Sequence, residues 1–267
     1  MDMKIGVVGC AGRMGRSLVR RIHDTERCVV AGGIEIAGHA EAGRDIGELA
    51  GVGRLGLTVS EDARALFAES DAVLEFSTPV ATATHAAVAA ETGTVHVIGT
   101  TGLNPDETNE LHTAAERVAI VWAPNMSVAV NLLLHLSEQV SAILDADYDV
   151  EIVEMHHRYK IDAPSGTALA LGQAAARGRG VEFEDVAVRG RDGLTGARPR
   201  GAIGLSALRG GDVVGEHSVI FAANGERLEL THRAASRDTF SRGAVRAALW
   251  ASGKPPGLYG MKDVLGR

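Results

Sequence analysis

Residues 154–168 read EMHHRYKIDAPSGTA and gather side chains that can transfer protons and bind anions. Three interpretations of His156, His157 and Lys160 compete. Zinc binding needs converging ligands, but adjacent histidines on a strand point to opposite faces, and neither a cysteine nor an HExxH partner lies nearby. A polar, solvated strand end would need no function. In the third interpretation, a histidine donates a proton near neutral pH while the lysine holds an anion or polarises a substrate.

The residues after Lys160 favour this third, chemical interpretation. A short Asp-Ala-Pro turn leads into Ser165, a suitable helix N-cap, before an alanine-rich helix pattern. Gly166 and Thr167 would then present N–H groups and one hydroxyl at a helix N-terminus, which is a ready anion site. A general acid, a cation and an anion-binding helix end therefore follow one another closely. This combination predicts a site for a small carboxylated substrate.

A glycine-rich loop, GCAGRMG at residues 9–15, follows the first strand pattern and opens a helix pattern. Glycines permit a tight turn and let backbone N–H groups approach a pyrophosphate at the positively polarised helix N-terminus. Glu35 ends the second strand pattern, where its carboxylate can accept hydrogen bonds from an adenosine ribose. The spacing is GxxGxxG rather than GxGxxG, so a strand–helix turn without a ligand is the alternative. The complete strand–loop–helix–strand unit favours dinucleotide binding.

Two further loops, GTTG at residues 99–102 and APNMS at residues 123–127, leave predicted strands. Ligands of open α/β sheets bind at the carboxyl ends of strands. We therefore expect these loops to line the nicotinamide side of a dinucleotide. Taken alone, either loop would be an ordinary turn.

A parallel sheet is needed to position these loops, and the first half of the chain predicts one. Short apolar runs indicate strands at residues 4–9, 28–35, 72–77, 95–99 and 118–123. Met14, Leu18 and Ile22 recur every four residues, as on one helix face, and residues 80–92 form an alanine-rich helix pattern. Such alternation implies right-handed crossovers and an α/β fold, here a Rossmann-like domain with helices on both faces of a mainly parallel sheet.

The second half of the chain has a different pattern. We expect a long helix at residues 128–145, a strand at 149–157 and a helix at 165–177, followed by a glycine- and arginine-rich loop. Residues 216–223 and 226–234 predict a hairpin across Asn224-Gly225, and residues 244–252 a last helix. Longer strands with fewer helices predict a second domain of α+β type with a mixed, mostly open sheet.

The composition argues against several classes of function. Of 267 residues, 45% are hydrophobic, enough for one large or two modest domains with a sizeable core. The net charge of −7 argues against general nucleic-acid binding, and no apolar run approaches the ~20 residues of a membrane span. The N-terminus enters a strand at once, without a signal-peptide layout. Cys10 and Cys28 are too few for a disulfide framework, and free thiols fit the cytoplasm.

The stretch Glu154–Ala168, with its HHxxKxDAPSGTA pattern, closely resembles the 4-hydroxy-tetrahydrodipicolinate reductase (dihydrodipicolinate reductase) family of the lysine and diaminopimelate pathway. The resemblance covers essentially the whole chain. The segments GCAGRMG, GTTG and APNMS resemble the family's cofactor segments, and similar stretches occur in the family at residues 209–217 and 231–233. The resemblance implies hydride transfer from NADH or NADPH to an unsaturated heterocyclic dicarboxylate, giving tetrahydrodipicolinate.

The resemblance also implies roles for individual residues. His156, the first of the pair, matches the family's proton donor, and Lys160 matches its second, assisting catalytic donor. The implied substrate-binding residues are His157, Ser165, Gly166 and Thr167. The implied cofactor-binding residues are Gly9, Cys10, Ala11, Gly12, Arg13, Met14, Glu35, Gly99, Thr100, Thr101, Ala123, Pro124, Asn125 and Met126. No metal ion is expected.

Family members are typically homotetramers built through the second domain, and their C-terminal segment returns to the cofactor domain. The resemblance therefore implies a dinucleotide-binding domain at residues 1–127 and 238–267, and a substrate-binding and oligomerisation domain at residues 128–237. The sequence departs from the family in two places. Cys10 stands where small residues are usual, which leaves function undisturbed. Ile36 follows Glu35 where some members carry an arginine, so a 2′-phosphate would meet the Glu35 carboxylate. We expect use of both cofactors, with NADH favoured.

Two rival functions remain at this point. Another two-domain nicotinamide-dependent dehydrogenase would share the layout but would lack HHxxKxDAPSGT. A non-enzymatic NAD-binding sensor would need the glycine loop but not the cluster of acid, lysine and anion site.

Overall fold

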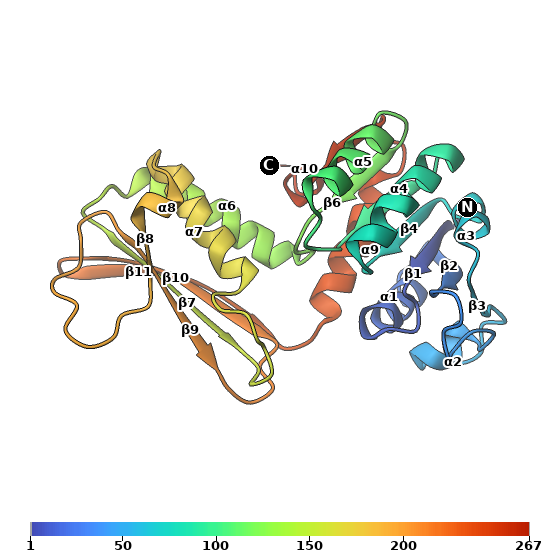
Figure 1. Ribbon diagram of the computed structural model, residues 1–267, viewed down its shortest axis with the longest axis horizontal. Coiled ribbons are helices and arrows are strands. Elements are labelled where there is room, and N and C mark those ends of the chain that lie inside the picture. The colour runs from blue at the N-terminus through green and yellow to red at the C-terminus, as the bar shows by residue number, and fades with distance from the viewer. Residues whose placement is uncertain (1, 267) are drawn as a thin grey trace. The chain divides into compact units, whose positions relative to one another are not determined.

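The computed structural model describes residues 2–266, which divide into two compact units (Figure 1). The first unit comprises the chain up to Val128 together with the segment from Arg237 onward, and the second comprises Ala129–Ser236. These bounds differ from the expected ones by one residue at each boundary.

A parallel sheet forms the middle of the first unit. Among the described residues it has seven strands in the order β12-β6-β5-β4-β1-β2-β3. The strands are β1 (Met3–Val8), β2 (Cys28–Ile34), β3 (Val59–Ser60), β4 (Ala72–Glu75), β5 (Val95–Ile98), β6 (Ala119–Trp122) and β12 (Gly257–Tyr259). The strand order reverses between β1 and β4. In open α/β sheets this switch point, at the carboxyl ends of the strands, is where ligands bind.

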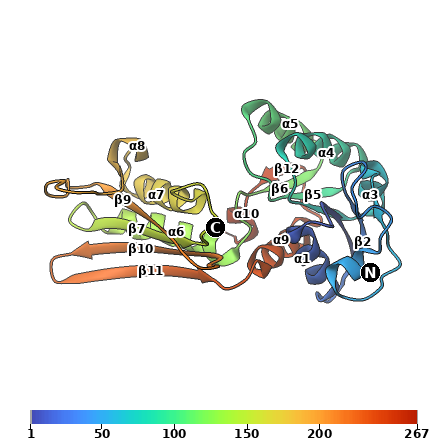
Figure 2. The ribbon, with the colours of Figure 1, turned by 60° about the horizontal axis from the view of Figure 1, so that its bottom comes forward.

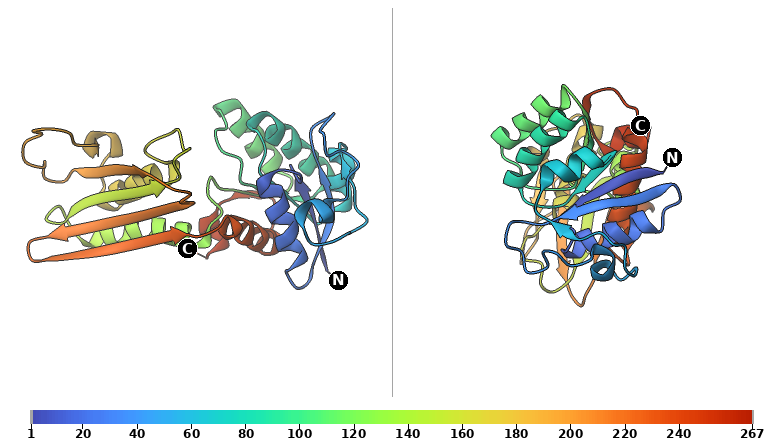
Figure 3. Two further views of the ribbon diagram at one scale, coloured as in Figure 1. Left: turned by 90° about the horizontal axis from the view of Figure 1, so that it is seen from below. Right: turned by 90° about the vertical axis from the view of Figure 1, so that its right-hand side faces the viewer.

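Helices cover both faces of the parallel sheet, each over its own buried apolar cluster (Figure 3). One face carries α1 (Arg13–His23), α2 (Ile46–Ala50), α9 (Asp238–Ala251) and α10 (Met261–Val264). The other carries α3 (Ala63–Glu69), α4 (Pro79–Thr92) and α5 (Pro105–Ala115). Burial on both sides explains why the strands read as continuous apolar runs. The predicted Rossmann-like architecture is confirmed.

The second unit holds a mixed sheet of five strands in the order β11-β10-β7-β9-β8, again counting the described residues. The strands are β7 (Asp149–His156), β8 (Ala187–Arg189), β9 (Ile203–Arg209), β10 (Gly215–Ala223) and β11 (Glu226–Ala234). Strands β7 and β8 run parallel to β9, whereas β10 is antiparallel to β7 and β11. The long β10–β11 hairpin is visible in Figure 2. The predicted α+β domain with a mixed sheet is confirmed.

Helices α6 (Val128–Ile143), α7 (Gly166–Arg179) and α8 (Phe183–Val186) accompany this sheet. The core joins inward side chains of β7, such as Val150 and Ile152, to Leu171 of α7 and Phe221 of β10. Within the described residues, every helix is too short or too polar to span a lipid bilayer.

Two predictions about secondary structure were wrong. The expected loop after α7 contains α8, β8 and β9. Gly204 weakens the strand pattern of β9, and its missing side chain leaves room for the Glu151 carboxylate, from which a Cβ would lie 2.0 Å away. The last large helix begins at Asp238 rather than Ala244. Its first turns contain Gly243, where a Cβ would lie 1.7 Å from the Met126 carbonyl oxygen, so tertiary packing overrides a weak helix propensity.

Candidate active site

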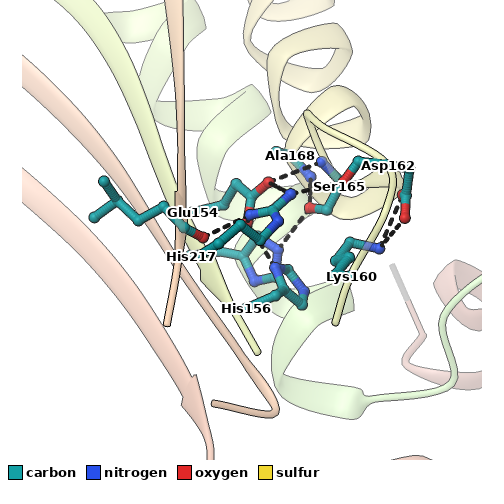
Figure 4. Close-up of polar contacts among 9 residues, drawn as sticks. Glu154, His156, Lys160, Asp162, Ser165, Ala168 and His217 are labelled. Atoms are coloured by element: carbon teal, nitrogen blue, oxygen red, sulfur yellow. Dashed lines mark hydrogen bonds and ion pairs between the residues drawn. The ribbon is translucent and has the colours of Figure 1, made fainter. Parts of the chain in front are cut away.

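His156 ends β7, and Glu154, two residues earlier, projects to the same side because strand side chains alternate. The Glu154 side chain has no exposed surface, whereas that of His156 is 13% exposed. Nδ1 of His156 lies 2.6 Å from Oε2 of Glu154 (Figure 4). An ionised carboxylate can only accept, so Nδ1 carries the hydrogen of this contact. A Cβ on Gly215 of β10 would lie 3.0 Å from Nε2 of His156, so this glycine leaves room at the outer ring nitrogen.

Two further groups hold Glu154. Arg209, which pairs with His156 across β7 and β9, donates from Nη1 and Nη2 to the two carboxylate oxygens at 2.8 Å each. The backbone N–H of Ser165 donates to Oε1 at 3.0 Å. Burial raises the pKa of Glu154, but the hydrogen bonds from Arg209, His156 and Ser165 outweigh burial and lower the pKa below its usual value. The carboxylate is therefore ionised and fixed in direction at neutral pH.

Ser165 joins this cluster to the start of α7. Its Oγ accepts the backbone N–H of Ala168 at 3.2 Å, so the predicted N-cap is confirmed. The same Oγ lies 3.1 Å from Nε2 of His217, which stands opposite Glu154 on β10. Burial first, and then the charge of His156, lowers the pKa of His217 to about 4. His217 is therefore neutral at pH 7, with its ring centroid 5.1 Å from that of His156.

The cation and the helix end predicted as an anion site lie beside this network. Lys160 Nζ donates to both oxygens of Asp162 at 2.7 and 2.8 Å (Figure 4). The Asp162 side chain is 59% exposed, so this is a surface ion pair of small net strength. Gly166 is exposed and Thr167 half-buried in the first turn of α7. His157 lies just past β7, with its ring centroid 6.5 Å from that of Tyr159.

The predicted residues therefore fall into two groups. The network joins His156 to Ser165, and Arg209 Nη2 also donates to the Asp162 carbonyl oxygen at 2.7 Å, which links Lys160 to the network through Asp162. Among residues 2–266, no hydrogen bond or ion pair joins the His157 side chain to it. Across these described residues, no three His, Cys, Asp or Glu side chains are grouped so as to hold a metal ion.

Sequence reasoning did not select three members of this network, Glu154, Arg209 and His217. A signal for Glu154 was present, because a carboxylate two positions before a histidine on a strand shares its face. The residues of β9 and β10 carried no comparable local signal.

The glycine loop between β1 and α1 has the form of a phosphate-binding turn. Gly9 has a φ of +72°, a left-handed conformation that favours glycine. A Cβ on Gly15 would lie 2.0 Å from the carbonyl oxygen of Gly9, so only glycine allows α1 to approach the loop so closely. Gly12 is the N-cap and has no side chain to occupy the helix end. These features fit a dinucleotide pyrophosphate at the N-terminus of α1.

The side chains around this loop differ in what they can offer. Cys10 is 1% exposed and packs against Gly33, and burial raises the pKa of its thiol to about 12. Arg13 is exposed and Met14 is half-buried. Glu35, just after β2, accepts the backbone N–H of Ala11 at 2.9 Å, which fixes its carboxylate beside the loop. Cys10 is therefore an inert, inward-facing thiol, and the side chain of Arg13 faces solvent.

The loop after β5 is packed against the loop after β4. A Cβ on Gly99 would lie 2.2 Å from the ring of Phe76. Thr100 is buried, and its Oγ1 accepts the backbone N–H of Ser77 at 3.1 Å. Thr101 is exposed. These contacts fix the loops after β4 and β5 to each other, and Thr101 is exposed beside them.

The loop after β6 is partly internal. Ala123 and Met126 are buried and belong to the core of the first unit. Pro124 is exposed, and the half-buried Asn125 accepts the backbone N–H of Ser127 through Oδ1 at 2.9 Å. Any ligand contact from Met126 would therefore come from its backbone.

Two family models match this chain and together span nearly all of it. The N-terminal part of dihydrodipicolinate reductase matches residues 3–126, and the C-terminal part matches residues 129–265. The chain belongs to the dihydrodipicolinate reductase family. The resemblance read from HHxxKxDAPSGTA is confirmed.

Curated relatives agree with the family models. The 4-hydroxy-tetrahydrodipicolinate reductase of Ruegeria pomeroyi is 53% identical over 262 residues, covering 98% of this chain and 97% of the relative. The protein of the same name from Parvibaculum lavamentivorans is 54% identical over 266 residues, covering 99% and 98%.

Solved structures support the fold. Dihydrodipicolinate reductase from Paenisporosarcina sp. TG-14, a structure with dipicolinate bound, superposes with a TM-score of 0.79 at 23% identity, covering 98% of this chain and 99% of that one. An amine dehydrogenase from Mycobacterium smegmatis superposes with a TM-score of 0.60 at 15% identity, covering 97% of this chain and 94% of that one. Other dehydrogenases thus share the layout, and the family models separate this chain from them.

Proposed function

We propose that this chain catalyses the NAD(P)H-dependent reduction of 4-hydroxy-tetrahydrodipicolinate to tetrahydrodipicolinate, in lysine and diaminopimelate biosynthesis. The observation that carries the proposal is the network of Glu154, His156 and Arg209 beside the N-terminus of α7, in a chain that the family models match from end to end. The bound nicotinamide supplies a hydride to one ring carbon of the substrate.

His156 supplies the proton that the reduced ring gains. Glu154 engages Nδ1, and the space beside Gly215 leaves Nε2 to meet the substrate. Glu154 thus sets the direction of the donor, and Arg209 keeps that carboxylate ionised. General acid catalysis of this kind contributes roughly 10²–10⁴-fold to a rate.

The substrate carboxylate is held at the start of α7. Gly166 and Thr167 offer backbone N–H groups at the positive end of a helix of 14 residues, and Thr167 adds a hydroxyl. Lys160 exchanges its exposed partner Asp162 for the substrate, since a surface ion pair is weak. His157 lies just past the end of β7 and is the further substrate contact that the likeness to the family implies. Because the protein has a net charge of −7, these local groups must provide the attraction for a dianion.

The cofactor is NADH or NADPH, with NADH favoured. Glu35 stands beside the glycine loop, where its carboxylate accepts hydrogen bonds from ribose hydroxyls and repels a 2′-phosphate. Its neighbour Ile36 is 73% exposed and offers no cation.

The active assembly is a cytoplasmic homotetramer built through the second unit. The face of its sheet that points away from the apolar core carries half-buried Val153, Met155 and Ile220, together with Leu208, which is 50% exposed. An apolar sheet face of this kind suits burial against another copy. Sedimentation of the purified protein measures the assembly.

The decisive experiment is NADH oxidation followed by absorbance, with fresh product of the preceding synthase as substrate. The proposal expects oxidation that depends on this substrate and is inhibited by pyridine-2,6-dicarboxylate. A sensor would bind NADH without turnover. A dehydrogenase of another specificity would turn over a different substrate and ignore the dicarboxylate.

A further inference from the structure

A second buried carboxylate lies in the first unit, at the carboxyl end of β4. Glu75 is the last residue of β4, and its side chain has no exposed surface. Its Oε1 lies 2.9 Å from Nδ1 of His85 on α4, and its Oε2 lies 2.7 Å from Nε2 of His96 on β5. Burial raises the pKa of Glu75, but the hydrogen bonds from His85 and His96 outweigh burial and lower the pKa to about 2. Glu75 is therefore an ionised group inside the first unit.

This cluster is connected to the loops after β4 and β5. The Ser77 hydroxyl donates to Oε1 of Glu75. The Ser77 N–H then donates to Oγ1 of Thr100 at 3.1 Å, and the Thr82 hydroxyl donates to the same oxygen at 2.9 Å. Nε1 of Trp122, at the end of β6, donates to the carbonyl oxygen of Thr100 at 3.2 Å. Thr100, which follows β5, is thus bonded to the ends of both neighbouring strands, β4 and β6.

An ionised carboxylate can accept from all three groups around Glu75. His85, His96 and the Ser77 hydroxyl converge on its two oxygens, and a carboxamide would replace one acceptor by an NH₂ donor. The cluster is also a poor source of folding stability. Nδ1 of His96 is buried without a hydrogen-bond partner among residues 2–266, and apolar side chains would fill such a site at least as well. What the cluster does supply is one fixed geometry at the strand ends.

We propose that Glu75 is a positioning residue for cofactor binding: through Ser77 it holds Thr100, and with it the loops after β4 and β5, in the conformation that receives NAD(P)H. The inference rests on the proposed function, in which these loops meet the nicotinamide side. A loop that occupies its binding conformation only part of the time weakens the apparent affinity by that fraction. Glu75 acts by keeping the fraction close to one.

The test is the affinity for NADH without turnover, measured by the fluorescence of bound NADH, in wild type, Glu75→Gln and the control Thr94→Val. Thr94 is buried at the opposite end of β5 and donates to the Phe67 carbonyl at 2.7 Å, so its replacement also removes a buried hydrogen bond but leaves Thr100 untouched. We expect Glu75→Gln to raise Kd for NADH about tenfold, as for a loop competent about a tenth of the time. Thr94→Val should leave Kd unchanged.

A second readout follows the loop itself. In a Trp250→Phe background, the emission of Trp122 reports on its hydrogen bond to Thr100, because these are the two tryptophans of the chain. We expect the emission to shift in Glu75→Gln and not in Thr94→Val. The inhibition constant of pyridine-2,6-dicarboxylate should stay the same in both variants.

Unchanged affinity for NADH in a Glu75→Gln protein whose Tm falls as in Thr94→Val would show that Glu75 serves stability alone, and would overturn the proposal. If Glu75→Gln does not fold, Ser77→Ala removes the hydroxyl bond to Glu75, Thr82→Val removes the hydroxyl bond to Thr100, and both leave Glu75 with its histidines. Wild-type affinity in both of these would overturn the proposal as well. A wild-type protein that binds neither NADH nor NADPH would overturn the proposed function together with this inference.

Discussion

Each unit contains a fully buried carboxylate that binds histidine, and the two clusters differ in the other groups that the carboxylate holds. In the second unit, Glu154 holds His156, whose side chain is 13% exposed. In the first unit, Glu75 holds the fully buried His96 and also His85, whose side chain is 14% exposed. It connects onward through Ser77 to the buried Thr100. Each arrangement therefore holds one partly exposed histidine, but the first adds an arginine to its carboxylate, and the second continues through a hydroxyl to a loop residue.

The partners of the two carboxylates suit the two clusters to different tasks. Glu154 is bound by Arg209, whose guanidinium keeps its charge at every relevant pH, so its histidine can lose a proton while the carboxylate stays paired. Glu75 has only two histidines and a hydroxyl. A residue that gives up a proton in each turnover needs the first environment. A residue that fixes a loop can use the second.

The largest expected effect tests the role of His156 in the Glu154 cluster. Replacing His156 by alanine should lower kcat by roughly 10²–10⁴-fold, because the proposed proton donor is lost. NADH affinity should hardly change, since the first unit is untouched. The neighbouring variant His157→Ala is the control and should act mainly through KM for the substrate. Steady-state turnover close to wild type in His156→Ala would assign the proton to another group.

Removing the charge of Glu154 should be the next largest effect. Glu154→Gln leaves Arg209 without its carboxylate, and breaking a buried pair costs about 3–5 kcal/mol. We expect the lower end, because the Arg209 side chain is 21% exposed. Denaturant unfolding measures this change. Glu151→Gln is the matched control on the opposite face of β7. The Glu151 side chain is 25% exposed, whereas that of Glu154 has no exposed surface, so solvent limits the cost to about 1 kcal/mol. Equal costs in the two variants would mean that Glu154 is no more than a surface partner.

Parts of these clusters could be predicted from the sequence. The motif predicted His156, Lys160 and Ser165, because these residues lie close together in the sequence, on one strand end, one turn and one helix start. Glu154 could have been predicted as well, because residues two apart on a strand share one face and Glu154 stands two positions before His156. The places of Arg209 and His217 depend on the register of β9 and β10 against β7, which pairs Arg209 with His156 and His217 with Glu154.

Register follows from sheet packing over tens of residues, and the sequence pattern of β9 was itself too weak to predict the strand. The cluster of Glu75, His85 and His96 was missed for a related reason. It joins three elements that come together only when the parallel sheet has formed.

The Glu154 and Glu75 clusters should also respond differently to pH. In the unfolded chain His217 takes up a proton near pH 6.5, but in the folded chain it does so only near pH 4. Between these values the unfolded state binds more protons, so the folded state loses stability as the pH falls, by about 3 kcal/mol in total. The pKa of Glu75 falls from 4.5 to about 2, so its contribution is lost only below pH 4.5.

His217→Gln should therefore flatten the stability of the protein between about pH 6.5 and about pH 4.5, a window set by linkage. Denaturant unfolding at several pH values measures the slope. The same slope in His217→Gln as in wild type would show that another group titrates in that window.

A substitution in the second unit should alter binding of the substrate without altering binding of the cofactor. Thr167→Val removes the hydroxyl that we propose meets the substrate carboxylate, and a hydrogen bond to a charged group contributes about 1.5–3 kcal/mol. Inhibition by pyridine-2,6-dicarboxylate should weaken by about tenfold or more, while Kd for NADH stays the same. An unaltered inhibition constant would move the anion site away from α7.

The smallest expected effect belongs to the first unit alone and concerns the choice of cofactor. Glu35 beside the glycine loop opposes a 2′-phosphate, and the exposed Ile36 offers no cation to receive one. The phosphate is screened by solvent, so the preference for NADH should be only about 1–2 kcal/mol. Ile36→Arg should move it toward NADPH, as compared by kcat/KM with each cofactor, and should leave the inhibition constant of pyridine-2,6-dicarboxylate unchanged. A clear preference of the wild type for NADPH would mean that a cation elsewhere in the first unit outweighs Glu35.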